Sequence, residues 1–302
     1  IGDTRASIQE YEACMNLSSS NWLARDAKSA RNASQNRLLA LNYISKTDDI
    51  MYLEHLAWGK QMQQNVALYM SNFGISVPHK HFTPVNTTTV KGKGQNGERT
   101  SSKLQECSST PKMRASLTIG YISADFFTHS VSYFILTALL HHSYERFRIV
   151  CYSTVASPDT KTEKIRKIVQ DRGGLWRDMQ RLSLIEAYRT VRNDEVDILV
   201  ELSGHTAGNS LALMATQAAP VQISWIGYPG TTGLDTIQYR FCDELTDPKS
   251  TTQRFTEALY RLPKSFLCYT PHEGLNEPVE APALKNGYVT FGSYNNLAKI
   301  LP

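Results

Sequence analysis

The hydrophobic pattern of the chain changes near residue 111. Before that point, residues 1–17 place their apolar side chains mostly on one helical face, and residues 22–73 hold two further apolar blocks at helical spacing. We therefore expect one amphipathic helix followed by two or three packed helices. Residues 83–110 contain scarcely an apolar side chain, too few to offset the entropy of ordering them, so we expect a mobile insert there.

After residue 111, short apolar runs alternate with helical segments, and helices are expected at 161–171 and 182–192. Such alternation predicts an α/β fold with a mostly parallel, doubly wound sheet and right-handed crossovers. A further strand is expected at 288–293, after a proline- and glycine-rich connection. Because a strand needs a sheet, we expect this strand to begin a second domain that the chain does not complete. The other candidate strands are 117–123, 147–153, 196–202, 221–226, 239–242 and 259–262.

Composition narrows the class of protein. The 302 residues are 41% hydrophobic and 20% charged, as in globular domains, and the formal net charge is only +4. Lys and Arg are scattered along the chain, which gives no reason to expect a nucleic-acid or membrane-surface partner. The five cysteines form no CxxC pair, so neither a disulfide framework nor a zinc site is expected, and a reducing compartment is favoured.

The first candidate site lies in the stretch 117–135. An apolar strand runs into the polar corner 125–130, and apolar residues then recur at helical spacing, so His129 and Ser130 stand at the start of a helix. In parallel α/β folds, strand ends and helix starts form the crevice where anionic ligands bind, because free helix N–H groups point into it. We therefore expect ligand chemistry near His129.

Three further stretches carry polar groups directly after strands. In 196–209, His205 is either placed for hydrogen bonding and proton transfer or only caps the following helix. In 225–233, the sequence WIGYPGTTG either presents N–H and hydroxyl groups to a ligand or is a tight turn that braces the domain. In 291–299, Lys299 either reaches a diphosphate as a point charge or is a solvated surface lysine.

Several familiar catalytic motifs are missing from the sequence. It contains no phosphate-loop, HExxH or GxSxG pattern, which removes the usual support for a kinase, a zinc protease or an esterase. His79 and His81 lack nearby carboxylates or cysteines, so no metal site is predicted.

Five blocks of sequence, taken in order, resemble the catalytic region of SPINDLY-type protein O-fucosyltransferases, relatives of the nucleocytoplasmic O-GlcNAc transferases in glycosyltransferase family 41. Residues 29–44 are similar to the junction that follows the tetratricopeptide repeats of those enzymes, and residues 1–17 resemble the second helix of such a repeat. The fixed order makes the resemblance specific. The blocks are GYISADFFTHSVSYFI, ELSGHTAGN, APVQISWIGYPGTTGL, LPKSFLCYTP and VTFGSYNNLAKI.

The resemblance implies a tetratricopeptide array followed by a two-domain glycosyltransferase of the GT-B type, with the sugar nucleotide in the cleft. This chain then holds a Rossmann-like N-terminal catalytic domain with a mostly parallel sheet, preceded by a remnant of the repeats and followed by a truncated C-terminal domain. The implied segments are 1–20, the end of the repeat array; 21–82, a helical connecting segment; 83–110, a flexible low-complexity linker; 111–285, the N-terminal catalytic domain; and 286–302, the start of the nucleotide-binding domain.

The same resemblance assigns roles residue by residue. His129 matches the family's cleft histidine, the first choice for removing the proton of a Ser or Thr hydroxyl, and Lys299 matches the lysine that holds the departing diphosphate. His205 matches a second active-site loop and is the third candidate catalytic residue. The candidate contacts to sugar nucleotide or substrate are Asp125, Ser130, Thr206, Tyr228, Pro229, Gly230, Thr231, Asn295 and Asn296.

The implied reaction is transfer of a sugar, with inversion and without a metal or cofactor, to Ser or Thr of cytoplasmic and nuclear proteins that the repeats select. The sequence around Asn296 and Ala298 is closer to the fucosyl branch, so GDP-fucose is the expected donor and UDP-N-acetylglucosamine (UDP-GlcNAc) the alternative. No nucleic-acid or membrane partner is implied. Because the chain holds only the start of the nucleotide-binding domain, we expect it to be inactive by itself, and a non-catalytic protein-binding module is the other alternative.

Overall fold

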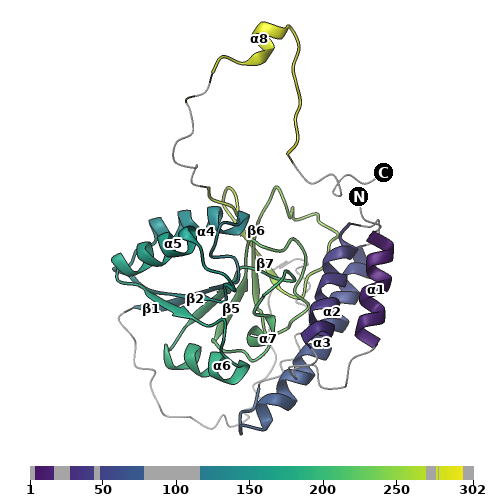
Figure 1. The fold of residues 1–302 in the computed structure, drawn as a ribbon, viewed down its shortest axis with the longest axis vertical. Helices are drawn as coiled ribbons and strands as arrows, with labels where there is room; N and C mark the ends of the chain where they lie inside the picture. The colour runs from purple at the N-terminus through teal and green to yellow at the C-terminus, as the bar shows by residue number, and fades with distance from the viewer. Residues whose placement is uncertain are drawn as a thin grey trace, which may run out of the picture.

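The computed structural model describes residues 4–16, 28–43, 48–77, 116–269, 277 and 279–294. Its first part is a layer of helices that pack side by side (Figure 1). This confirms the expected amphipathic helix and the packed helices after it. One such layer cannot show a repeat period, so the remnant of a tetratricopeptide array stays a prediction. The helices are α1 (Thr4–Asn16), α2 (Lys28–Leu41) and α3 (Asp48–Ser71).

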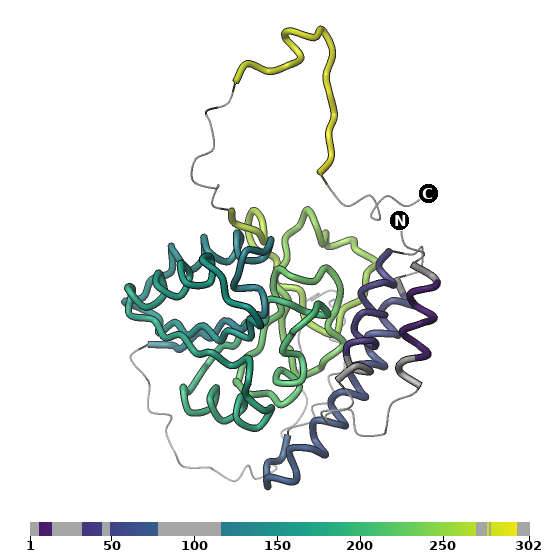
Figure 2. Tube along the Cα trace, in the orientation of Figure 1, coloured from purple at the N-terminus to yellow at the C-terminus, as the bar shows by residue number. Residues whose placement is uncertain are grey.

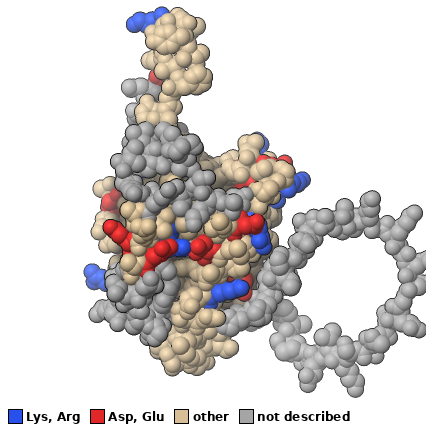
Figure 3. Space-filling view, turned by 90° about the vertical axis from the view of Figure 1, so that its right-hand side faces the viewer, with Lys and Arg blue, Asp and Glu red and all other residues tan. Residues whose placement is uncertain are grey.

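An ion-pair network joins the three helices. Arg37 of α2 donates to Glu12 of α1 at 2.8 Å and makes two bonds to Glu54 of α3 at 2.8 and 3.1 Å. Figure 3 views the molecule from the side on which these helices lie in Figure 1, and it shows acidic side chains in a band across that side. The Arg37 side chain is only 15% exposed, so solvent screens these pairs less than ordinary surface pairs. Arg37 therefore ties the helices into one layer.

Seven parallel strands form one sheet in the order β3-β2-β1-β4-β5-β6-β7. β1 has β2 on one side and β4 on the other, so the winding of the chain reverses between β1 and β4, which is the switch point of a doubly wound sheet. The predicted parallel α/β sheet is confirmed. The strands are β1 (Leu117–Ser123), β2 (Phe147–Ser153), β3 (Leu175–Asp178), β4 (Ile198–Glu201), β5 (Val221–Ser224), β6 (Tyr239–Asp243) and β7 (Ala258–Leu262).

Helices cover both faces of the sheet (Figure 1). Met62 and Val66 of α3 belong to the same buried cluster as Val191 and Met214, which lie on the helices of one face. The N-terminal helices therefore share a core with the sheet, and Figure 2 shows them beside the green segment that follows β5. The covering helices are α4 (Ser130–His141) and α5 (Thr160–Asp171) on one face, and α6 (Leu184–Asn193) and α7 (Leu211–Met214) on the other.

One strand was missed by the sequence analysis, and one predicted strand does not form. β3 was not predicted, because it is only four residues long at the sheet edge and its last two residues are exposed, which leaves no apolar pattern to find. Residues 288–293 form no strand: Phe291 is 92% exposed, and no strand in the described part of the chain lies beside it to complete a ladder. A short helix, α8 (Pro282–Asn286), precedes that stretch and extends away from the sheet (Figure 1).

The predicted insert at 83–110 lies outside the described residues. Among the helices that the structure describes, none combines the length and the apolar character needed to cross a bilayer.

Candidate functional site

The carboxyl ends of β1 and β4 meet at the switch point of the sheet. The loop after β1 contains Asp125 and the loop after β4 contains Ser203, whose hydroxyl donates to the Asp125 carboxylate at 3.2 Å. The backbone N–H of Asp125 donates to the Ser123 hydroxyl at 2.9 Å. The two loops are therefore held together at the position where doubly wound folds bind ligands.

His129 stands at the rim of this crevice as the N-cap of α4. Its Nδ1 accepts a bond from the Val131 N–H at 3.3 Å and lies 3.7 Å from the Asp125 carboxylate. With Nδ1 as acceptor, a neutral imidazole carries its proton on Nε2. The side chain is 40% exposed and can meet a ligand, and Ser130 beside it is the exposed first residue of the helix. The predicted strand, polar corner and helix start are confirmed.

Two buried carboxyl groups lie beneath the rim. Burial raises the pKa of Asp125, against the opposing effects of His129 and of the Ser203 hydroxyl. Glu201, at the end of β4, is fully buried and accepts bonds from the Ser203 and Gly204 N–H groups at 3.1 and 2.7 Å. Burial raises the pKa of Glu201 to about 7. Glu201 was not among the predicted site residues, although its place at the end of the strand, two residues before the SGHTAGN loop begins, was a usable signal.

His205 is fully buried, and its ring contacts His55, Trp58 and Tyr228. Its Nε2 lies 2.8 Å from the Thr232 carbonyl, to which it can only donate, while the buried Nδ1 has no hydrogen-bond partner. Burial, with His55 nearby, lowers the pKa of His205 well below its usual range, so the ring is neutral. The predicted alternative that His205 caps the next helix was wrong, because the N-cap of α7 is Ser210 and makes no side-chain cap bond.

The loop 225–233 begins with a strained turn. Ile226 has φ of 68°, and the Gly227 N–H donates to the Trp225 carbonyl at 3.0 Å, which together describe a γ-turn of the rare, strained type. A β-branched residue seldom adopts positive φ, and such strain persists only where the surroundings over-determine it. The fold thus fixes the entry to this loop.

Arg240 of β6 holds the middle of the loop. Its guanidinium, 4% exposed, donates to the carbonyls of Tyr228 at 2.8 Å, Pro229 at 3.0 Å and Gly230 at 3.3 Å. The loop is therefore held in place by Arg240 beneath it. Whether the loop presents groups to a ligand or braces the domain stays a prediction. Pro229 is exposed at the tip, whereas Gly230 is buried.

Glu257 holds the end of the loop. Its carboxylate accepts from the Thr231 hydroxyl at 2.6 Å, from the Thr232 N–H at 2.8 Å, and from the Thr232 hydroxyl. Neither Arg240 nor Glu257 was predicted, because nothing local in the sequence marks a distant charge that will be buried under a loop.

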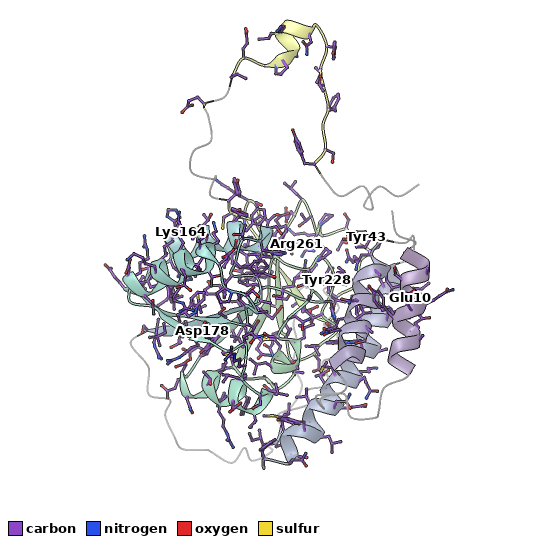
Figure 4. The ribbon with its side chains drawn as sticks, in the orientation of Figure 1. Glu10, Tyr43, Lys164, Asp178, Tyr228 and Arg261 are labelled. Atoms are coloured by element: carbon purple, nitrogen blue, oxygen red, sulfur yellow. The ribbon has the colours of Figure 1, made fainter. Side chains whose placement is uncertain are left out.

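The remaining predicted residues are spread over two regions. The Thr206 hydroxyl donates to the Ser203 carbonyl at 2.9 Å, which closes its own loop. Tyr228 is 1% exposed and its hydroxyl lies against α2 and α3, between the helices and the sheet (Figure 4). Asn295, Asn296 and Lys299 lie outside the described residues. Within the described ranges, no group of three His, Cys, Asp or Glu side chains is arranged to hold a metal ion.

Comparison with known proteins agrees with this arrangement. The glycosyl transferase family 41 pattern matches residues 100–277. A tomato (Solanum lycopersicum) protein named "probable UDP-N-acetylglucosamine–peptide N-acetylglucosaminyltransferase SPINDLY" is 45% identical over 274 residues, 90% of this chain and 26% of its own length. The Arabidopsis thaliana protein of the same name is 44% identical with the same coverage, and the Arabidopsis protein named SEC is 29% identical over 62% of this chain and 20% of its own.

The fold comparison points the same way. A solved structure of a mutant Thermobaculum terrenum O-GlcNAc transferase matches 90% of this chain and 46% of its own with a TM-score of 0.64 at 24% identity, which identifies the sheet as the Rossmann-like domain of a GT-B-type fold. The chain spans about a quarter of the length of the curated relatives it matches. With more than half of its residues matched by the family pattern, the chain belongs to glycosyl transferase family 41.

Proposed function

We propose that the full-length protein carrying this chain transfers fucose from GDP-fucose to Ser or Thr of other proteins, with inversion and without a metal. The observation that carries the transferase is the family match over residues 100–277, joined to SPINDLY relatives at 42–45% identity over at least 90% of the chain. The choice of fucose rests on the sequence around Asn296 and Ala298 alone. We also propose that tetratricopeptide repeats select the protein substrates, in the cytoplasm and the nucleus.

His129 is the proposed general base. The acceptor hydroxyl attacks the anomeric carbon of the donor, its proton passes to the imidazole, and the bond to the diphosphate breaks. To accept that proton at Nε2, the ring must carry its other proton on Nδ1. The Asp125 carboxylate, 3.7 Å from Nδ1, can then accept a hydrogen bond from that N–H group. The bond from the Val131 N–H must then be released, so Asp125 is the proposed orienting group.

Lys299 is the proposed partner of the leaving diphosphate. Negative charge grows on the diphosphate as the bond breaks, so a lysine stabilises the transition state more than the ground state. The braced loop 228–233 is the proposed wall of the sugar pocket, because its backbone is fixed by Arg240 and Glu257 before any ligand binds.

UDP-GlcNAc is the second candidate donor, because the SPINDLY and SEC relatives are named N-acetylglucosaminyltransferases. The deciding assay supplies the purified full-length protein with each radiolabelled donor and a protein extract as acceptor. Incorporation from GDP-fucose alone supports the proposal, incorporation from UDP-GlcNAc alone replaces the donor, and incorporation from neither refutes the transferase.

The role of His129 is tested by substitution in the same assay. His129→Ala should lower kcat by roughly a hundred- to ten-thousand-fold. Because the capping bond at 3.3 Å is long, stability should change by less than about 1 kcal/mol. His141→Ala, an exposed histidine at the other end of α4, is the matched control and should leave kcat unchanged. Equal turnover in both variants would remove His129 from the mechanism.

A further inference from the structure

Helices α2 and α3 contact two loops of the candidate site, those after β4 and β5. Gln35 of α2 donates to the Asn209 side chain at 3.1 Å, on the loop after β4. Asn42, next to α2, donates to the Tyr228 hydroxyl at 2.9 Å, on the loop after β5. Gly59 of α3 approaches so closely that a Cβ there would overlap the Gly233 carbonyl. Helices that precede the sheet by many residues therefore pack directly against the loop 228–233.

His55 of α3 is the centre of this contact. Its Nδ1 lies 2.6 Å from the Met51 carbonyl and its Nε2 lies 2.7 Å from the Tyr228 hydroxyl. A carbonyl only accepts, so Nδ1 carries the proton and Nε2 accepts from Tyr228. Asn42 donates to the same hydroxyl, which gives a directed chain from Asn42 through Tyr228 and His55 to Met51. Every polar atom of the His55 ring is used in that chain.

A second contact joins His55 to the other loop. The His55 and His205 rings meet edge to face with centroids 5.1 Å apart, and Trp58 contacts His205 in the same way at 4.5 Å. His205 donates to the Thr232 carbonyl, and Tyr228 packs on His205 at 5.1 Å. Both ends of the loop 228–233 are therefore fixed to α3 through one buried cluster. Burial lowers the pKa of His55, which agrees with the neutral ring that the cluster needs.

We propose that His55 is a positioning residue for the sugar pocket: it fixes the loop 228–233 through the Tyr228 hydroxyl and the His205 ring, so that α3 is a structural part of the donor site. Its effect on turnover rests on the proposed function, whereas its effect on the loop does not. His55 touches no reacting atom in this scheme, and its influence passes through Tyr228.

The test uses the full-length protein and a double-mutant cycle. His55→Phe keeps a ring in the cluster but leaves the Tyr228 hydroxyl only the Leu38 carbonyl, at 3.4 Å, in place of the His55 acceptor at 2.7 Å. Tyr228→Phe removes the hydroxyl itself. Hydrogen exchange of the 227–233 amides should accelerate on the order of tenfold in His55→Phe. The double variant should exchange more slowly than His55→Phe alone, because neither half of the bond is then left unpaired. A purely space-filling role for His55 would not produce that rescue.

Val66→Ala is the matched control. It removes buried apolar atoms from the same helix, three turns beyond His55, and should leave exchange in the loop at the wild-type rate after correction for global stability. Donor KM should rise about tenfold or more in His55→Phe and stay unchanged in Val66→Ala.

The outcomes separate the two proposals. Loop exchange in His55→Phe that is no faster than in Val66→Ala, or effects of His55→Phe and Tyr228→Phe that simply add, would overturn the positioning role. A wild-type protein that transfers neither sugar would overturn the proposed function, and the exchange cycle would still decide whether His55 fixes the loop.

Discussion

Replacing Arg240 by methionine should destabilise the sheet domain by about 3–5 kcal/mol. The guanidinium supplies the donors for the carbonyls of Tyr228, Pro229 and Gly230, at distances from 2.8 to 3.3 Å. Methionine keeps an unbranched aliphatic stem but donates nothing. The carbonyls of the buried residues Tyr228 and Gly230, left unpaired, cost about 1–3 kcal/mol each, whereas water can reach the exposed Pro229. The substitution also removes a buried charge, and with it the cost of keeping that charge away from water. This gain offsets part of the loss and gives the range of about 3–5 kcal/mol.

The charge of Arg240 contributes to the same effect. Burial lowers the pKa of Arg240, while Glu257 and Asp247 raise it, so the guanidinium stays charged at neutral pH. Glu257 is 4% exposed and holds the end of the same loop. In Arg240→Met this carboxylate loses a cationic neighbour inside the protein, which adds to the cost.

Urea unfolding of the 302-residue chain, followed by tryptophan fluorescence, measures the loss directly. In a thermal scan of the same two proteins, the melting temperature of Arg240→Met should be lower by about 6–20 °C, at the usual 2–4 °C per kcal/mol for a domain of this size. Arg254→Met is the matched control: Arg254 is 51% exposed, pairs with Asp49 and lies over the Tyr52 ring, so its loss should cost less than about 1 kcal/mol. Arg240→Met within about 1 kcal/mol of the wild type would refute the bracing argument.

Other substitutions test the buried groups and the proposed chemistry. Burial lowers the pKa of His205 from 6.5, so its contribution to stability is present above pH 6.5 and is lost as pH falls through the lowered value. The difference in urea midpoint between wild type and His205→Phe should therefore shrink below pH 6.5, and a constant difference would contradict the neutral ring. Burial raises the pKa of Glu201 from 4.5 to about 7, so its contribution is present below pH 4.5 and lost as pH rises through 7. Glu201→Gln should gain stability relative to wild type across that interval, and parallel pH profiles of the two proteins would argue against the raised pKa. In the full-length protein, Lys299→Ala should lower kcat roughly a hundred- to a thousand-fold without shifting the urea midpoint, and unchanged turnover would remove the lysine from the mechanism.

The sequence predicts the centre of the sheet well and its edges poorly. β1 and β2 are buried along most of their length, so their apolar runs are visible without a structure. The start of α4 after His129 is equally clear, because a polar corner separates two different periodicities. β3 has no such signal, and 288–293 has a strand-like composition but no neighbouring strand in the described residues. Pairing partners, not local sequence, decide whether such a segment becomes a strand.

The residues of the candidate site likewise fall into those that the sequence predicts and those that it does not. His129 was predicted from the helix start that follows a polar corner, and Asp125 opens that corner and was named through the family resemblance. The structure places the two together at the switch point. Arg240 and Glu257 act on a loop ten or more residues before them, through a crossover that sequence spacing does not reveal. His55 is farther still, 173 residues from the hydroxyl it accepts from. Residues that hold a loop from behind carry no local motif, so sequence reasoning finds the rim of the site and misses its support.

That support also changes how the N-terminal helices are understood. In the sequence, the polar stretch 83–110 separates residues 21–82 from the sheet, so these residues were predicted to be a helical connecting segment. In the structure, α3 instead contributes to the core of one sheet face, and two glycines, Gly59 and Gly233, allow its backbone to touch the loop after β5. A Cβ at either position would collide with backbone that cannot move aside, so the contact needs glycine on both sides. A connector that only linked two domains would not require so close an approach; a helix that sets the position of a binding loop would.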